Sequence, residues 1–251
     1  MRLNLISYPF YVVRVFNDIV QTKNGSNMIL QPMDNLFLNE EINYARVYDR
    51  FYDIKKDDII IDIGAHVGIF TLRAARQAKN VLAIEPHPFN YSLLTNNVKA
   101  NKLVNVQTLR LALWSSNGKM KLYLASSASH SLKPYLKDKS KYLEVQTKTL
   151  DTIIKELGIK RVNFIKIDVE GAELEVLRGA EETLKENDPF ISIAAYHTST
   201  EVHEITEYLQ RKGFRVFVPE SKCLQVFKSK GKIITTLRKH INMGRLFTDE
   251  L

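Results

Sequence analysis

The stretch from Asp58 to Phe70 constrains the fold more than any other part of this chain. It begins with apolar, largely β-branched residues that do not alternate with polar ones, which predicts a strand buried on both faces. The strand leads into a turn with glycines at Gly64 and Gly68, and a helix is expected from Thr71 to Lys79. Free backbone N–H groups in such a turn favour an anion or a carboxylate, so this stretch predicts the entry to a nucleotide site.

The spacing of the two glycines narrows the choice of ligand. His66 and Ile69 stand where the Gly-x-Gly-x-x-Gly pattern of dinucleotide-binding proteins has its second and third glycines. This departure disfavours a nicotinamide or flavin site. The turn fits better the first motif of S-adenosyl-L-methionine (SAM) methyltransferases, with Asp62 at the end of the strand facing the ligand.

Strands and helices are expected to alternate along the rest of the chain and to form a mostly parallel sheet with helices on both faces. Ligands of such sheets bind beyond the carboxyl ends of the strands. Asp62, Glu85, Asp168 and His197 all fall at predicted strand ends, which is the main argument for a single site. Glu85 follows Asp62 by 23 positions, where a carboxylate can accept both hydroxyls of a ribose.

Three motifs identify a family resemblance. Asp62-Ile-Gly-Ala-His-Val-Gly68, Glu85-Pro86, and Ile165-Lys-Ile-Asp168-Val-Glu170-Gly171-Ala-Glu173 with Leu177-Arg-Gly179-Ala180 resemble the FkbM-type methyltransferases, over roughly residues 57–216. The resemblance implies a class I SAM-dependent methyltransferase, an α/β three-layer sandwich with a mostly parallel, seven-stranded sheet. It also implies O-methylation of a hydroxyl on a sugar, a glycolipid or a small metabolite. The residues expected to bind SAM are Asp62, Gly64, Ala65, His66, Gly68, Glu85, Pro86, Ala112, Leu113 and Asp168.

Three residues are the candidates for catalysis. Asp168 could hold the amino group of SAM, bind the acceptor or bind a metal, and Glu170 lies nearest to it on the following turn. His197 is the best candidate for the general base that takes the proton of the acceptor hydroxyl. Asp168 and Glu170 could ligate Mg²⁺ through oxygen, but nothing else in the sequence requires a metal, and no metal site is predicted.

The chain divides into an N-terminal cap (1–50), a methyltransferase domain (51–228) and a basic tail (229–251). Within the cap, Tyr8 to Val20 is expected to form an amphipathic helix, and Asn24-Gly25 predicts a hairpin turn. A second hairpin, made of 120–125 and 143–150, is expected as an insertion beside the substrate mouth.

The composition limits the cellular compartments and the binding partners that suit this chain. A lone cysteine, Cys223, excludes an internal disulfide and suits a reducing cytoplasm. The apolar segment Leu3 to Val20 is interrupted by Arg14 and Asp18, so it predicts no bilayer span, although a peripheral membrane contact stays open. The net charge of +8 permits an anionic membrane surface or RNA as a partner of the basic tail, besides a small-molecule or glycan acceptor. An RNA methyltransferase and a non-catalytic SAM-binding or nucleic-acid-binding protein therefore remain as alternatives.

Overall fold

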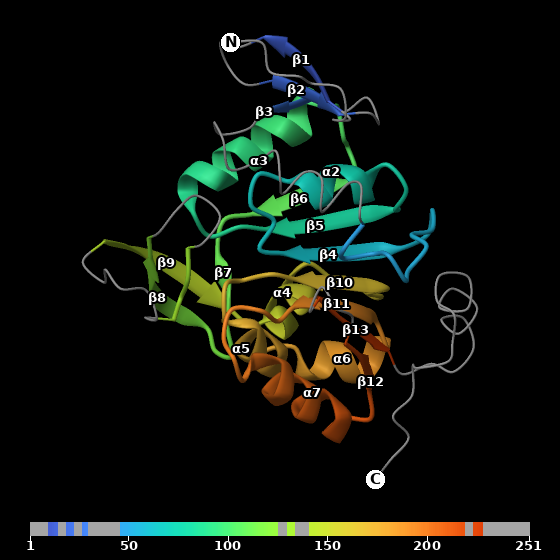
Figure 1. Cartoon of the computed structure of the whole chain (residues 1–251), viewed down its shortest axis with the longest axis vertical. Helices are drawn as coiled ribbons and strands as arrows, with labels where there is room; N and C mark the ends of the chain where they lie inside the picture. The colour runs from blue at the N-terminus through green and yellow to red at the C-terminus, as the bar shows by residue number, and fades with distance from the viewer. Residues whose placement is uncertain are drawn as a thin grey trace.

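A computed structural model describes residues 10–14, 19–22, 27–29, 46–124, 130–133, 141–218 and 223–227. Seven of the described strands form the central sheet, in the order β12-β13-β11-β10-β4-β5-β6 (Figure 1). Their bounds are β4 Ile59–Ile63, β5 Asn80–Ile84, β6 Val106–Leu109, β10 Phe164–Ile167, β11 Phe190–Ala194, β12 Arg215–Phe217 and β13 Cys223–Phe227. The five strands from β11 to β6 pair in parallel, and β12 and β13 form an antiparallel hairpin at one edge. The predicted seven-stranded, mostly parallel sheet is confirmed.

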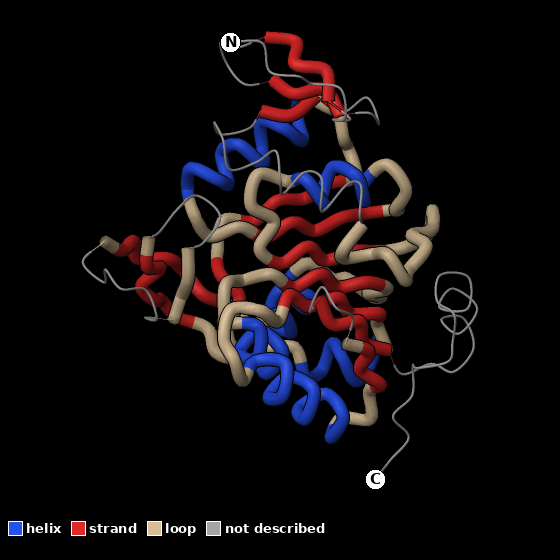
Figure 2. Tube along the Cα trace, in the orientation of Figure 1, coloured by secondary structure: helices blue, strands red, loops and turns tan. Residues whose placement is uncertain are grey.

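Helices pack on both faces of this sheet because consecutive strand residues point in opposite directions. Ile61 of β4 packs in one apolar core, whereas its neighbour Ile60 packs in another. The first core includes side chains from α4 (Leu150–Glu156), α5 (Glu173–Arg178), α6 (Glu181–Asn187) and α7 (Glu201–Arg211). The opposite face is covered by α2 (Ile69–Ala75) and α3 (Pro88–Ala100). Figure 2 shows α2 and α3 toward one end of the row of strands and α4 to α7 toward the other.

Two short helices, α5 and α6, follow β10. The break lies at Gly179, where an added Cβ would be 2.2 Å from the carbonyl oxygen of Trp114. The chain at this point therefore lies too close to a neighbouring segment for a larger residue. The second helix, α6, has its own N-terminal cap, because the carboxylate of Asp151 accepts two backbone N–H groups of its first turn, at 3.0 and 2.8 Å.

The described part of the N-terminal cap is a small antiparallel sheet of β1 (Phe10–Arg14), β2 (Ile19–Thr22) and β3 (Asn27–Ile29). The predicted hairpin between β2 and β3 is confirmed, but the helix expected from Tyr8 to Val20 is wrong. Aromatic and β-branched residues fill β1, and these favour a strand. The sheet lies next to α3 (Figure 1). Apart from residues 46–50, the rest of the cap lies outside the described residues, as does the basic tail.

The predicted insertion is present as a second small sheet, made in the described residues of β7 (Ala112–Leu113), β8 (Gly118–Tyr123) and β9 (Tyr142–Lys148). β8 and β9 pair antiparallel, as expected. The sheet has an apolar cluster of its own around Leu122 and Val145. None of the helices in the described ranges combines the length and apolar character needed to cross a bilayer.

Candidate functional site

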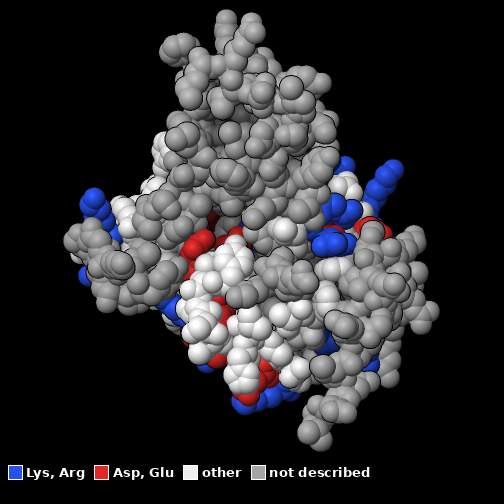
Figure 3. Space-filling view, viewed as in Figure 1, with Lys and Arg blue, Asp and Glu red and all other residues white. Residues whose placement is uncertain are grey.

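A cavity of about 320 Å³ opens at the carboxyl ends of β4, β5 and β10. The strand order reverses between β4 and β10, and ligands of open α/β sheets bind at such a switch point. Acidic side chains show at a hollow near the middle of the face drawn in Figure 3. Twelve predicted site residues were expected to meet here, and the wall includes Gly64, Ala65, His66, Glu85, Pro86, Ala112, Leu113, Asp168 and Glu170.

Glu85 forms one end of the cavity, and the backbone around it fixes its carboxylate. Its Oε2 accepts the N–H of His66 and its Oε1 accepts the N–H of His87, each at 2.9 Å. Burial raises the pKa of Glu85 to about 7, although these two backbone donors oppose the shift. Each carboxylate oxygen can accept a second hydrogen bond, so the group is positioned to receive two hydroxyls.

The glycine turn after β4 is organised differently from the prediction. The N–H groups of Gly64 and Ala65 both donate to the carbonyl of Ile84, at 3.0 Å, and the N–H of His66 holds Glu85. Two of these donors therefore support the end of β5 and are not free, whereas the third binds a carboxylate, as expected for this turn, but one that belongs to the protein. Gly64 has a φ of +75°, and an added Cβ would lie 1.8 Å from the carbonyl oxygen of Asp168. The glycine is needed because the turns after β4 and β10 touch.

Asp62 and Gly68 lie behind the wall of the cavity, which corrects their predicted contact with the ligand. The Asp62 carboxylate is fully buried and accepts the Thr71 hydroxyl at 2.5 Å. Gly68 begins α2 with a φ of +95°, and an added Cβ there would lie 2.7 Å from Leu94 of α3. Both residues support the turn from within.

Lys166 occupies the place that was expected for Asp62. Its Nζ lies 3.2 Å from Oδ1 of Asp62, donates to the carbonyl of Gly64 at 2.6 Å, and helps to line the cavity. Burial lowers the pKa of Lys166, but the carboxylates of Asp62 and Asp168 outweigh burial and raise it. The lysine therefore stays charged. Sequence reasoning missed this residue, although a lysine inside an otherwise apolar strand was a usable signal.

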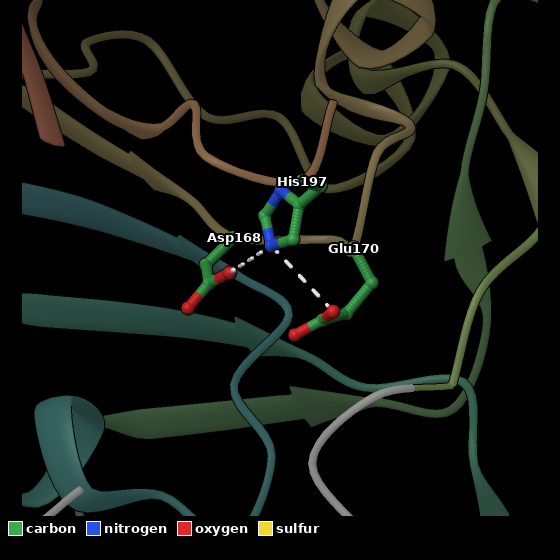
Figure 4. A group of neighbouring side chains, drawn as sticks. All are labelled: Asp168, Glu170 and His197. Carbon is green, nitrogen blue, oxygen red and sulfur yellow. Dashed lines mark ion pairs between the residues drawn. The ribbon is translucent and has the colours of Figure 1, made fainter. Parts of the chain in front are cut away.

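The other end of the cavity is acidic (Figure 4). Asp168 and Glu170 line it, and His197 lies just behind them with 5% of its side chain exposed. Nε2 of His197 is 3.7 Å from Oδ1 of Asp168 and 3.5 Å from Oε2 of Glu170. The other ring nitrogen, Nδ1, is 3.4 Å from both Glu173 and Glu201. The three predicted catalytic residues are thus brought together.

This arrangement shifts the pKa of His197. Burial by itself lowers the pKa of the imidazole, but the carboxylates of Glu170, Glu201 and Glu173 outweigh burial and raise the pKa to about 11. The surrounding carboxylates therefore favour the protonated ring at neutral pH. The general-base role of His197 stays a prediction, and Asp168 and Glu170, not His197, are the members of this group that line the cavity.

Two contacts hold the acidic end in place. The hydroxyl of Tyr48 donates to Oδ2 of Asp168 at 2.5 Å, and the hydroxyl of Ser131, from the inserted segment, donates to the carbonyl of Glu170 at 2.6 Å. Glu170 itself has a φ of +56°, which is uncommon for a residue with a side chain. No local pattern in the sequence marked Tyr48 or Ser131, because their partners lie 120 and 39 positions away.

Comparison with known proteins gives this geometry a context. The family model for the methyltransferase FkbM domain matches residues 62–216. A methyltransferase of Sordaria araneosa, sdnD, is 28% identical over 79% of this chain and 89% of its own length. The hexuronic acid methyltransferase AglP of Haloferax volcanii is 28% identical over 62% of this chain and 63% of its own length. The crystal structure of a methyltransferase FkbM from Methylobacillus flagellatus KT superimposes with a TM-score of 0.54 and 19% identity, over 78% of this chain and 54% of that one.

Proposed function

Because the chain belongs to the FkbM methyltransferase domain family, we propose that this methyltransferase uses SAM and methylates a hydroxyl oxygen of a sugar, a glycolipid or a small metabolite. The observation that carries the proposal is the placement of carboxylates at the two ends of one cavity. A buried carboxylate, Glu85, stands at one end of it, and the carboxylates of Asp168 and Glu170 stand at the other.

The first end fits the nucleoside part of SAM. Glu85 is fixed by two backbone donors and keeps acceptor capacity for the ribose hydroxyls. Ala112 and Leu113 give the adenine an apolar wall. Gly64 also lines the cavity, and it has no Cβ that would collide with the turn after β10. When bound, SAM supplies a methyl group on a positively charged sulfur, which an acceptor oxygen displaces in line.

The second end fits an acceptor that carries a hydroxyl. Asp168 and Glu170 can accept the hydrogen of that hydroxyl and hold its oxygen, and positioning of this kind supplies up to about 7–11 kcal/mol of rate enhancement. Tyr48 fixes Asp168, so the carboxylate has a defined direction. The hexuronic acid methyltransferase among the relatives supports a sugar as the acceptor.

Calorimetric titration tests the cofactor. We expect saturable binding of SAM to the wild-type protein. We expect binding to weaken by about 1–3 kcal/mol in Glu85→Gln, which keeps the size of the side chain but loses charge-assisted hydrogen bonds. A control variant, Glu144→Gln, changes an exposed carboxylate of β9 and should bind as the wild type does. If the folded wild-type protein binds no SAM, the proposal fails.

An acceptor screen with methyl-labelled SAM tests the rest. We expect label in hydroxylated sugars, uronic acids, glycolipids or small metabolites, and loss of transfer in Glu170→Gln. Transfer to RNA alone would support the RNA methyltransferase instead. SAM binding without transfer to any of these classes would support the non-catalytic alternative.

A further inference from the structure

His197 is buried among acidic side chains, and its ring nitrogens make long ion pairs with four carboxylates. Among the described residues, neither ring nitrogen of His197 has a hydrogen-bond partner, and the same holds for Oδ1 of Asp168. The side chain is 95% buried, because only 5% of it is exposed. Buried polar atoms without partners cost stability, so such a group needs an explanation.

The separations around Nε2 suit a shared ion better than a hydrogen bond. The 3.7 Å to Asp168 and the 3.5 Å to Glu170 exceed the usual range of hydrogen bonds. Two ligand atoms that each lie about 2.1 Å from one metal ion are about 3.0–3.5 Å apart in octahedral or tetrahedral geometry, so the distance to Glu170 falls at the upper end of this range and the distance to Asp168 lies slightly beyond it. Figure 4 shows Nε2 directed between the two carboxylates, and one ligand atom from each of the three residues lies within 4.8 Å of the others.

We propose that Asp168, Glu170 and His197 bind a divalent metal ion at the acceptor end of the cavity. One imidazole nitrogen and two carboxylate oxygens form a mixed ligand set, which suits Mn²⁺ and similar transition metals better than Mg²⁺. The ion takes the place of the proton on Nε2 and supplies positive charge to a region where four carboxylates surround one ring.

A second acidic group on the same ring is the weaker candidate. Glu173 and Glu201 flank Nδ1, and with His197 they also satisfy metal-ligand spacing. However, Glu173 already accepts the N–H of Val169 and Glu201 accepts the N–H of His197, each at 2.9 Å. Neither carboxylate lines the cavity, whereas Asp168 and Glu170 do. Of the two candidate positions, only the one between Asp168, Glu170 and His197 would leave coordination positions of the ion open to the cavity.

The position of the site defines what the ion does. An ion held by Asp168 and Glu170 can bind the acceptor oxygen, polarise its O–H bond and fix its position. This role rests on the proposed function, but the binding of the ion does not. A second oxygen of the acceptor, such as the neighbouring hydroxyl of a sugar, would complete the coordination.

Binding of Mn²⁺ to the chelator-treated, dialysed full chain tests the site without SAM. We expect about one Mn²⁺ per chain, measured by the loss of the free-ion electron paramagnetic resonance signal and by calorimetry. Glu170→Gln and Asp168→Asn should each weaken binding by about tenfold or more. Circular dichroism and retained thermal unfolding would show that the variants are folded.

Two control variants locate the ion. Glu144→Gln removes an exposed carboxylate on β9 and should retain Mn²⁺ binding, whereas Glu201→Gln removes a carboxylate 3.4 Å from Nδ1 of His197 and should weaken binding less than Glu170→Gln does. The proposal is overturned if the wild-type protein binds no stoichiometric Mn²⁺, or if Glu170→Gln binds it unchanged. Loss in Glu201→Gln with retention in Glu170→Gln would place the ion in the second group and would equally overturn it. SAM binding by the same preparation separates this result from the cofactor proposal.

Discussion

At the scale of single residues, Glu85 links the chemistry of the site to pH. Its pKa is raised to about 7 by burial, so the group changes charge near neutrality. Only the ionised carboxylate can accept hydrogen bonds from both ribose hydroxyls at full strength. We therefore expect SAM affinity to be highest above pH 8 and to fall as the pH drops through 7, by about tenfold between pH 8 and pH 6. Calorimetric titrations at fixed ionic strength would measure this fall.

The matched control for that dependence is Glu85→Gln, whose amide does not titrate. Its SAM affinity should be low and nearly constant over the same range. An equal slope in the variant and the wild type would show that some other group, or the ligand itself, is responsible.

At the scale of elements, the turn at residues 46–52 positions Tyr48 against Asp168, and a buried ion pair fastens this turn to α2. Asp49 is fully buried and binds the guanidinium of Arg73 through both carboxylate oxygens, one of them at 2.6 Å from Nη1. Removal of one partner leaves a buried, uncompensated charge. We expect Asp49→Ala to lower the free energy of unfolding by about 3–5 kcal/mol, measured by urea denaturation.

Asp53 offers a control four residues away, because it is exposed and belongs to the same segment. Asp53→Ala should change the free energy of unfolding by no more than about 0.5 kcal/mol. Similar losses in the two variants would contradict a specific role for the buried pair. A loss in Asp49→Ala alone would show that the segment is part of the folded core.

At the scale of the whole molecule, the cavity joins parts of the chain that lie far apart. In sequence order its wall begins with Tyr48 and ends with Tyr196, and it includes Leu122 and Leu132 of the insertion. A ligand that binds only the folded state stabilises all of these parts together. At 100 times its dissociation constant, SAM should add about 2.7 kcal/mol to the free energy of unfolding. That corresponds to a rise in Tm of about 5–11 °C for a domain of this size.

Differential scanning calorimetry with and without SAM would measure the rise, and Glu85→Gln at the same SAM concentration should show a smaller one. An unchanged Tm at saturating SAM would mean that the ligand binds outside the folded cavity or not at all.

The sequence by itself determined the sheet and the place of the site. Uninterrupted apolar runs specify buried strands, and glycines at Gly64 and Gly68 specify positive φ angles; both signals are local. Because parallel strands end at one edge, it also followed that Glu85, Asp168 and His197 would lie at the same edge of the sheet. The prediction of a helix at Tyr8–Val20 was wrong. The residues of β1 are compatible with an amphipathic helix or with a strand, and in the structure they pair with β2.

Only the tertiary structure decided which groups face the cavity and which charges they carry. Lys166 lines the wall and Asp62 lies behind it, although the two residues are about a hundred positions apart and form one ion pair. Carboxylates from several elements converge on the imidazole of His197 and raise its pKa. Such properties depend on distances of a few ångströms between residues remote in sequence, and on desolvation by the folded chain, so no local pattern encodes them.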